Sequence, residues 1–313
     1  MAISLAGAWN VQCYREKEVR EHEILLPGTI NGCGLGDVIS EKTEWNSSLH
    51  NPFWYEREEY KEGTREEFRV PFLSQPKSFF SGKAKYIRKI TVEQEGDYYL
   101  FIELSRWKLE LWIDGDFIGC EESLCAPFCF GPFHLLYGEH ELEVLVDNGM
   151  QHPYRPDGHG VSDALNANWI GMGGALLLLT EEEYQEKEEK KKRYALEHPR
   201  TVTTKDGAIV VDGKPEYMRG THFGGDFPLS GIPNVEMSYW EELFRKIKEW
   251  GFNFVRCHSF CPPEAAFAAA DAEQIYIQVE CGMWNTFRPG SPMLKVLERE
   301  TKKISQAFGH HPS

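Results

Sequence analysis

Residues 250–280 read WGFNFVRCHSFCPPEAAFAAADAEQIYIQVE and decide the fold class of the second half of the chain. An apolar run at 252–255 gives way to the polar stretch 256–259, and a second apolar run at 275–279 ends on Glu280. Short apolar runs of this kind are typical of buried parallel strands, and the Ala-rich stretch between them predicts a helix. Residues 250–280 therefore predict one strand–helix–strand unit of a (β/α) barrel, in which functional side chains lie where the strands end.

The sequence on both sides of this unit continues the alternation of strands and helices. A first strand is expected at 217–223, and residues 238–250 repeat apolar side chains at helical spacing, with Ser238 as the expected N-cap. Two further helices are expected from 264 to about 271 and from 292 to 308. This order of elements predicts the first three strands of a TIM barrel.

The first half of the chain has a different pattern. Residues 5–179 form a series of short strand-like runs that are separated by turns. The clearest turn is Asp114-Gly115, which lies between two apolar runs and is a strong hairpin signal. Many short strands without helices between them predict a β-sandwich.

Residues 181–192, EEEYQEKEEKKK, separate the two halves. Their acidic residues come first and their basic residues last, an order that suits the helix dipole and predicts a solvated connector helix. The predicted organisation is therefore a β-sandwich at 1–179, a charged helical linker at 180–200, and the amino-terminal portion of a (β/α)8 barrel at 201–313.

Composition narrows the classes of partner. The formal net charge of −15 argues against nucleic acid, whose phosphates require a basic face, and against anionic membranes. The amino terminus lacks the pattern of a signal peptide, and no apolar run is long enough to span a bilayer, so a cytoplasmic protein is expected. The eight cysteines are expected to stay reduced, and their spacings do not favour zinc.

Several motifs follow one another along nearly all 313 residues. They are LAGAWN at 5–10, LPGT at 26–29, IDGDFIG at 113–119, PF at 127–128, LEVLVDN at 142–148, NWIGMGG at 168–174, DGKP at 212–215, GFNFVRCH at 251–258, IYIQVE at 275–280 and HHPS at 310–313. In this order they resemble glycoside hydrolase family 2, the group of β-galactosidases, β-glucuronidases and β-mannosidases.

The resemblance implies a jelly-roll sugar-binding sandwich, a TIM barrel, and retaining hydrolysis of a terminal β-linked sugar without a cofactor. Two departures qualify it. A short charged stretch stands where the family usually has an immunoglobulin-like domain. The HHPS motif ends at Ser313, and in the family it immediately precedes the strand with the Asn-Glu acid/base pair. Both catalytic carboxylates are therefore expected beyond Ser313, and the chain alone is expected to be catalytically silent.

The strand ends supply the candidate substrate-binding residues. Glu280 is expected to line the site, where it could hold sugar hydroxyls, bind a metal or orient a neighbouring residue. The alternative is an ion pair with Arg256 across adjacent strands. The resemblance implies that Arg256 supports the site from behind the residues that contact the sugar. His222 and His258 are candidates for hydrogen bonds to sugar hydroxyls, with a purely structural role as the alternative.

Loops supply weaker candidates. Trp284 is expected to stack on a sugar ring or to pack within its loop, and the resemblance implies substrate contacts for Asn166 and Asn168. A loop rich in Pro and Gly also contains side chains of metal-ligand type, but their spacing does not support a metal site. These side chains are His152, Arg155, Asp157, His159 and Asp163.

Other functions stay open. A carbohydrate-binding module without catalysis is the alternative; exposed Trp54, Tyr55 and Trp107 on a sheet face would favour it, and buried rings would favour a supporting role. A structural or interaction protein is a third possibility. An open barrel piece would expose a strand edge and an apolar face, so we expect either a homo-oligomer or a missing C-terminal segment to cover them.

Overall fold

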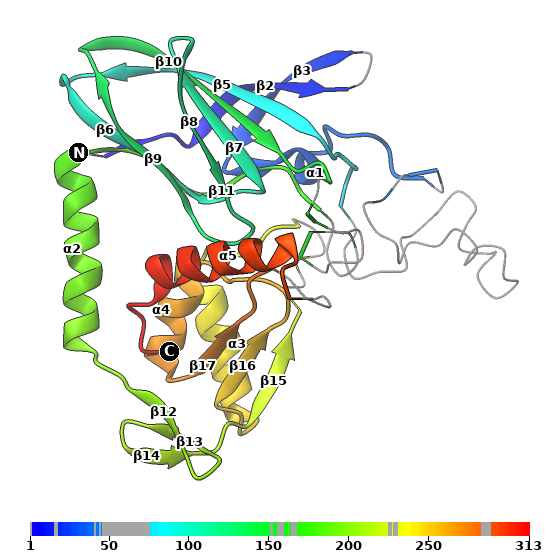
Figure 1. The fold of residues 1–313 in the computed structure, drawn as a ribbon. Coiled ribbons are helices and arrows are strands. Elements are labelled where there is room, and N and C mark those ends of the chain that lie inside the picture. Colours follow the sequence, from blue (N-terminus) through cyan, green and yellow to red (C-terminus); the bar gives the residue numbers. More distant parts are fainter. Residues whose placement is uncertain are drawn as a thin grey trace, which may run out of the picture.

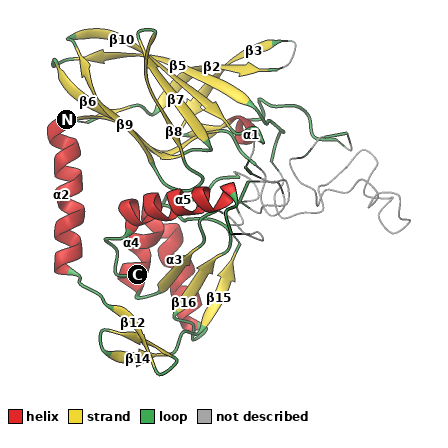
Figure 2. Ribbon diagram, viewed as in Figure 1, coloured by secondary structure: helices red, strands yellow, loops and turns green. Residues whose placement is uncertain are grey.

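The computed structural model describes residues 2–15, 18–40, 42–43, 45, 76–150, 153–154, 160–161, 163, 168–224, 227, 231–282 and 289–313. An all-β body carries the amino-terminal part, and an α/β body carries the carboxy-terminal part (Figure 1). Helix α2 runs along one side of the molecule between them, and helix α5 lies across the space where the two bodies meet (Figure 2).

The all-β body consists of two antiparallel sheets. The first has the order β3-β2-β5-β10-β7-β8, formed by Val19–Leu26, Gly7–Tyr14, Lys83–Val92, Gly138–Asp147, Lys108–Ile113 and Asp116–Glu122. The second has the order β1-β11-β6-β9, formed by Ile3–Ser4, Gly171–Thr180, Gly96–Leu104 and Phe128–Leu135, with β4 (Gly28–Thr29) paired to β11 and followed by α1 (Ile30–Cys33). Alternate residues of both sheets share one apolar core, as expected for a sandwich.

The predicted turn between β7 and β8 is present. Asp114 and Gly115 both have positive φ, 52° and 85°, as a two-residue hairpin turn of type I′ requires. The Asp114 carboxylate also accepts a hydrogen bond from the backbone N–H of Glu141 at 2.8 Å, which ties the turn to β10.

Helix α2 (Glu181–Glu197) begins at a capping box in which the Thr180 hydroxyl and the Glu183 carboxylate satisfy each other's backbone N–H groups. The helix is not solvated on every side. Tyr184 stacks on Tyr99 of β6 with ring centroids 4.0 Å apart, and the Tyr194 hydroxyl donates to Asp271 at 2.9 Å. The charged helix therefore contacts both bodies.

In the α/β body, a small antiparallel sheet comes first and a parallel sheet follows. The small sheet contains β12 (Val202–Lys205), β13 (Ala208–Val211) and β14 (Lys214–Glu216). The parallel sheet has the order β15 (Gly220–Phe223), β16 (Phe254–Cys257) and β17 (Tyr276–Val279), with α3 (Met237–Glu249), α4 (Glu264–Glu273) and α5 (Pro292–Phe308). The strand–helix alternation is confirmed, and the described residues form no closed barrel.

The expected start of α3 is wrong by two residues. The N-cap is Glu236 and not Ser238, and it makes no side-chain capping hydrogen bond. Asn234 stabilises the start of α3 instead. Its side chain accepts a hydrogen bond from the Glu236 N–H at 2.8 Å, and its backbone carbonyl accepts one from the Trp240 indole at 2.7 Å. The buried Trp240 thus fixes where the helix begins.

The open face of the parallel sheet is more polar than the sequence led us to expect. His222, Arg256 and Gln278 are register partners across the three strands, so their side chains point to the same face. His222 and Gln278 are exposed. Apolar residues of β17 instead pack with α5, and the Ile277 N–H donates to the Ser313 carbonyl at 2.9 Å, which satisfies part of the strand edge. None of the helices in the described part of the chain is both long and apolar enough to cross a membrane.

Candidate functional site

The carboxyl ends of the three parallel strands bring together four of the predicted residues. Arg256 of β16 and Glu280, which directly follows β17, form an ion pair, with Arg256 Nε 2.5 Å from Glu280 Oε1. The other carboxylate oxygen, Oε2, accepts from the Ser259 N–H at 2.8 Å. The side chains of Glu280 and Arg256 are 13% and 28% exposed, so the pair is partly screened from water.

Ser259 has a backbone conformation that is unusual for a residue with a side chain. Its φ is 62°, in the left-handed region, and only 3% of its surface is exposed. Strained residues of this kind persist where their surroundings hold them and cluster at functional sites. Here the conformation accompanies the hydrogen bond from the Ser259 N–H to Glu280, which fixes the carboxylate from a second direction.

The two candidate histidines lie side by side at the same end of the sheet. Their ring centroids are 5.8 Å apart with an interplanar angle of 21°. Arg256 Nη1 lies 3.1 Å from His222 Nε2. A guanidinium has only donors, so His222 Nε2 accepts this bond and the ring proton resides on Nδ1. His222 is exposed and His258 is half-buried, so both rings lie partly at the surface.

This arrangement suits binding better than proton transfer. Retaining hydrolysis requires two carboxyl groups about 5 to 5.5 Å apart, one as acid/base and one as nucleophile. Within the cluster just described, Glu280 is the carboxylate, and both of its oxygens are occupied by Arg256 and Ser259. The cluster therefore presents a rigid ion pair beneath two imidazoles.

Asn168 lies in the segment just before β11. It is 1% exposed, its side-chain amide donates to the Asn148 carbonyl at 3.0 Å, and its backbone N–H donates to Asp163. These contacts hold the segment before β11 in place. The substrate contact expected of Asn168 stays a prediction, and in this position its side chain has no solvent-exposed surface to offer a sugar.

Several other candidates lie outside the described residues. They are Trp284, Asn166, His152, Arg155, Asp157, His159, Trp54 and Tyr55.

Trp107 is described, and its position bears on the alternative function. The ring is fully buried, 5.1 Å from the ring of Tyr154, and belongs to a core with Met293 and Val296 of α5. A ring buried between the sandwich and α5 is a packing element. Trp107 therefore favours a supporting role for the sandwich over a binding module with this ring on an exposed face.

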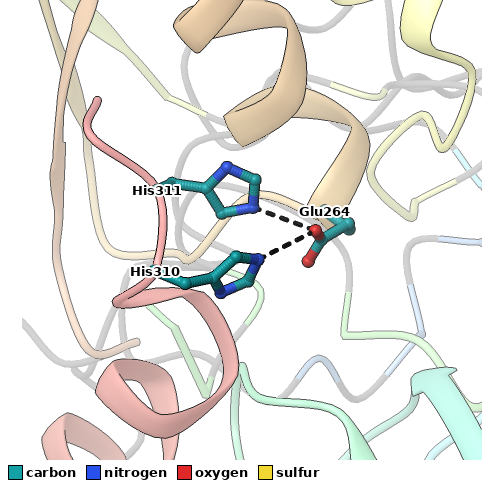
Figure 3. A group of neighbouring side chains, drawn as sticks. All are labelled: Glu264, His310 and His311. Carbon is teal, nitrogen blue, oxygen red and sulfur yellow. Dashed lines mark hydrogen bonds and ion pairs between the residues drawn. The ribbon is translucent and has the colours of Figure 1, made fainter. Parts of the chain in front are cut away.

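A second polar cluster was missed in the sequence. Glu264, the first residue of α4, faces His310 and His311, which follow α5 (Figure 3). Glu264 Oε1 lies 2.9 Å from His311 Nε2 and 3.5 Å from His310 Nε2. His311 Nδ1 is also 2.6 Å from Asp271 Oδ2. The adjacent pair His310-His311 was the only local signal, because no local pattern shows that Glu264 lies nearby.

The two histidines of this cluster differ in their protonation. Burial opposes the charged form of His311, but the hydrogen bonds and charges of Asp271 and Glu264 outweigh it and raise the pKa to about 9. Burial, together with the neighbouring His311, lowers the pKa of His310. The adjacent rings therefore hold different charges at neutral pH.

Comparisons with known proteins agree on the fold. No protein-family model matches the chain, and no curated protein matches it. Solved structures do match, among them a family 2 (GH2) β-galacturonidase from Eisenbergiella tayi bound to galacturonate, with a TM-score of 0.61 at 12% identity. The β-glucuronidase of Ruminococcus gnavus matches with a TM-score of 0.65 at 13% identity, and its complex with uronic isofagomine with 0.62 at 13%.

The alignments cover all of this chain and 64%, 65% and 66% of those three chains, respectively, which is less than two thirds of each. At such low identity the likeness shows the fold: the sandwich and the parallel strands are arranged as in the corresponding region of these glycosidases. The structural resemblance to family 2 enzymes expected from the motifs is confirmed.

Proposed function

We propose that this chain provides part of the sugar-binding site of a family 2-like retaining glycosidase. In this proposal the two antiparallel sheets are the jelly-roll sandwich, and β15, β16 and β17 are the first three strands of a TIM barrel. The ligand is a terminal β-linked sugar. The observation that supports the proposal most strongly is the polar cluster of His222, Arg256, His258 and Glu280 at the carboxyl ends of parallel strands, where barrel enzymes bind their substrates.

Each residue of the cluster has a proposed role. His222 and His258 exchange hydrogen bonds with sugar hydroxyls, because a neutral imidazole offers one donor and one acceptor. Arg256 does not contact the sugar; it holds Glu280 and, through Nη1, sets the tautomer of His222. The ion pair is thus a positioning element for the two rings.

The chain alone is proposed to bind sugar without cleaving it. A second carboxyl group at the distance that retention requires is needed for cleavage. Glu280 has both oxygens engaged and is not poised as an acid or a nucleophile.

Uronic acids are the first sugars to test. Two of the structural neighbours are complexes with galacturonate and with uronic isofagomine, so we extend the proposal to a β-linked uronic sugar.

The test is calorimetric titration of the 313-residue chain with glucuronate, galacturonate and galactose. We expect saturable binding of at least one uronate, weakened about tenfold or more in His258→Ala and His222→Ala, since each removes hydrogen bonds worth about 1–3 kcal/mol. His134→Ala is the matched control, because His134 is an exposed histidine of β9 that also contacts carboxylates.

Two results would contradict the proposal. One is the absence of sugar binding, or binding that neither histidine substitution weakens. The other is cleavage of p-nitrophenyl β-glycosides by the chain that Glu280→Gln abolishes, because that would make Glu280 a catalytic residue.

A further inference from the structure

Three ligand-type atoms converge where α4 begins and the chain leaves α5. Glu264 Oε1, His310 Nε2 and His311 Nε2 all lie within 4.8 Å of one another, with 2.9 and 3.5 Å from the carboxylate oxygen to the two imidazole nitrogens. In a tetrahedral zinc site with bonds near 2.0–2.1 Å, ligand atoms lie about 3.3 Å apart. Small side-chain shifts therefore suffice to place all three atoms around one ion (Figure 3).

We propose that Glu264, His310 and His311 bind a divalent transition-metal cation of the zinc type. Two imidazoles and one carboxylate are a ligand set that suits Zn²⁺, and carboxylate–imidazole sets do not favour Ca²⁺ or Mg²⁺, which prefer oxygen ligands throughout. The site is separate from the sugar-binding cluster, since it shares no residue with it. It also does not depend on the glycosidase proposal.

The surroundings of His311 match those of a metal-bound histidine. Such histidines almost always donate their second ring N–H to a carboxylate or carbonyl, which fixes the ring and its tautomer. His311 Nδ1 lies 2.6 Å from Asp271 Oδ2, and Asp271 is itself held by the Tyr194 hydroxyl and the Ser313 N–H, each at 2.9 Å. With Nδ1 donating to Asp271, the Nε2–H of His311 donates to Glu264. A cation that binds here displaces this proton to solvent, and Nε2 then offers its lone pair to the ion.

The three proposed ligands border a cavity. A cavity of about 490 Å³ between α2 and α4 is lined by all three proposed ligands and by Lys187, Lys191 and Tyr194. A site with three protein ligands and one accessible position accommodates water or an exogenous ligand. Because lysine ammonium groups line this cavity, we infer that the fourth ligand is an anion or hydroxide.

Cobalt binding tests the site. Co²⁺ is titrated into chelator-treated 313-residue chain while the visible d–d absorption is recorded, and Zn²⁺ is then added as competitor. We expect one Co²⁺ per chain with the strong absorption of tetrahedral cobalt, lost on addition of Zn²⁺. Glu264→Gln and His310→Gln are expected to weaken binding by tenfold or more. Asp271→Asn is expected to weaken it about 10- to 100-fold, as outer-shell substitutions do.

The matched control is His134→Gln. His134 also lies against two carboxylates, Asp97 at 2.9 Å and Glu95 at 3.4 Å, but it contacts them with different ring nitrogens, and it belongs to no three-ligand group among the described residues. This substitution should leave the cobalt spectrum and the affinity unchanged.

Protection against heat supplies a second readout in case a substituted chain does not fold. Zn²⁺ should raise the unfolding temperature of the wild-type chain, because an ion that binds only the folded state stabilises it, and should not raise that of the nearly isosteric Glu264→Gln. The proposal is overturned if Co²⁺ shows no saturable tetrahedral spectrum, if Zn²⁺ leaves the unfolding temperature unchanged, or if binding survives both Glu264→Gln and His310→Gln.

Discussion

The ion pair between Arg256 and Glu280 holds the strand ends of β16 and β17 together. Of the roles that the sequence allowed for Glu280, the structure shows the contact with Arg256, supplemented by the Ser259 N–H. The pairing was predictable because apolar strands ending on Arg and Glu bring the two groups to one edge. The left-handed backbone of Ser259 was not predictable, because it depends on the position of Glu280 in the folded chain.

Removal of Arg256 should therefore be costly. Arg256→Met leaves the partly buried Glu280 carboxylate with the Ser259 N–H and hydroxyl but no cation, and we expect a loss of about 1–3 kcal/mol in the free energy of unfolding, measured by urea denaturation. The double variant Arg256→Met/Glu280→Gln should recover part of that loss.

The matched control is Arg245→Met, which breaks the more exposed pair between Arg245 and Glu273, 3.2 Å apart. Exposed pairs contribute about 0–1 kcal/mol. Equal losses for Arg256→Met and Arg245→Met would show that the strand-end pair is an ordinary surface contact.

Helix α5 packs between the two bodies, and its helical range was predicted from Pro292 to Phe308. Its docking was not predicted, because the periodicity of a helix identifies an apolar face but not the partner of that face. In the structure Glu300 is completely buried, and its Oε2 accepts from the Ser123 hydroxyl at 2.9 Å and the Leu124 N–H at 2.8 Å. Arg299 adds an ion pair with Glu122 of β8 at 2.6 Å.

Glu300→Ala should destabilise the packing of α5 against the sandwich. It leaves two buried donors of the sandwich, the Ser123 hydroxyl and the Leu124 N–H, without their acceptor, and we expect a loss of about 2–4 kcal/mol in the free energy of unfolding. The control is Glu298→Ala on the exposed side of the same helix, with a change within about 0.5 kcal/mol. A loss for Glu300→Ala no larger than that of the control would contradict the docking described here.

The turn between β7 and β8 should respond to pH. His140 Nδ1 lies 2.6 Å from Asp114 Oδ2, and Nε2 lies 2.9 Å from the Leu136 carbonyl. Both ring nitrogens thus face acceptors, which favours the doubly protonated ring; burial opposes it, but the bonds to Leu136 and Asp114 prevail and raise the pKa of His140.

A raised pKa gives the sign of the effect. The stabilisation that His140 contributes is fully present below the pKa of His140 in the unfolded chain, near 6.5. It is lost as the pH rises through the higher pKa of His140 in the folded chain. The urea midpoint of the wild-type chain should fall relative to that of His140→Gln between pH 6 and pH 8. Parallel pH profiles of the two chains would exclude this contribution.

At the scale of the whole molecule, the two bodies approach each other closely at two glycines. A Cβ built on Gly160 would lie only 1.7 Å from the Gly282 carbonyl oxygen, so Gly160→Ala must push the loop after β17 away from the sandwich. We expect a loss of about 1–3 kcal/mol, as for other overpacked sites. In Gly96→Ala, the control, the new Cβ would meet nothing within 4 Å. Comparable thermal unfolding of the two variants would rule out tight packing at this point.

How well each feature could be predicted from the sequence depends on how far apart along the chain its interacting residues lie. Strands, helices and the Asp114-Gly115 turn depend on local pattern, and the order of motifs pointed to the fold that solved structures share. The polar row across β15, β16 and β17 required the register between strands. The cluster of Glu264 with His310 and His311 joins the start of α4 to the segment after α5, and no local pattern in a single sequence encodes such a contact.

Sugar binding at the strand ends is best tested by the ring signals of the histidines in an NMR titration of the 313-residue chain with glucuronate and galacturonate. If the parallel strands carry a sugar site, the signals of His222 and His258 shift together and saturate with one dissociation constant, while those of His134 and His140 on the sandwich do not move. Unchanged signals of His222 and His258 at saturating sugar, or shifts confined to the sandwich histidines, would contradict a sugar site at the strand ends.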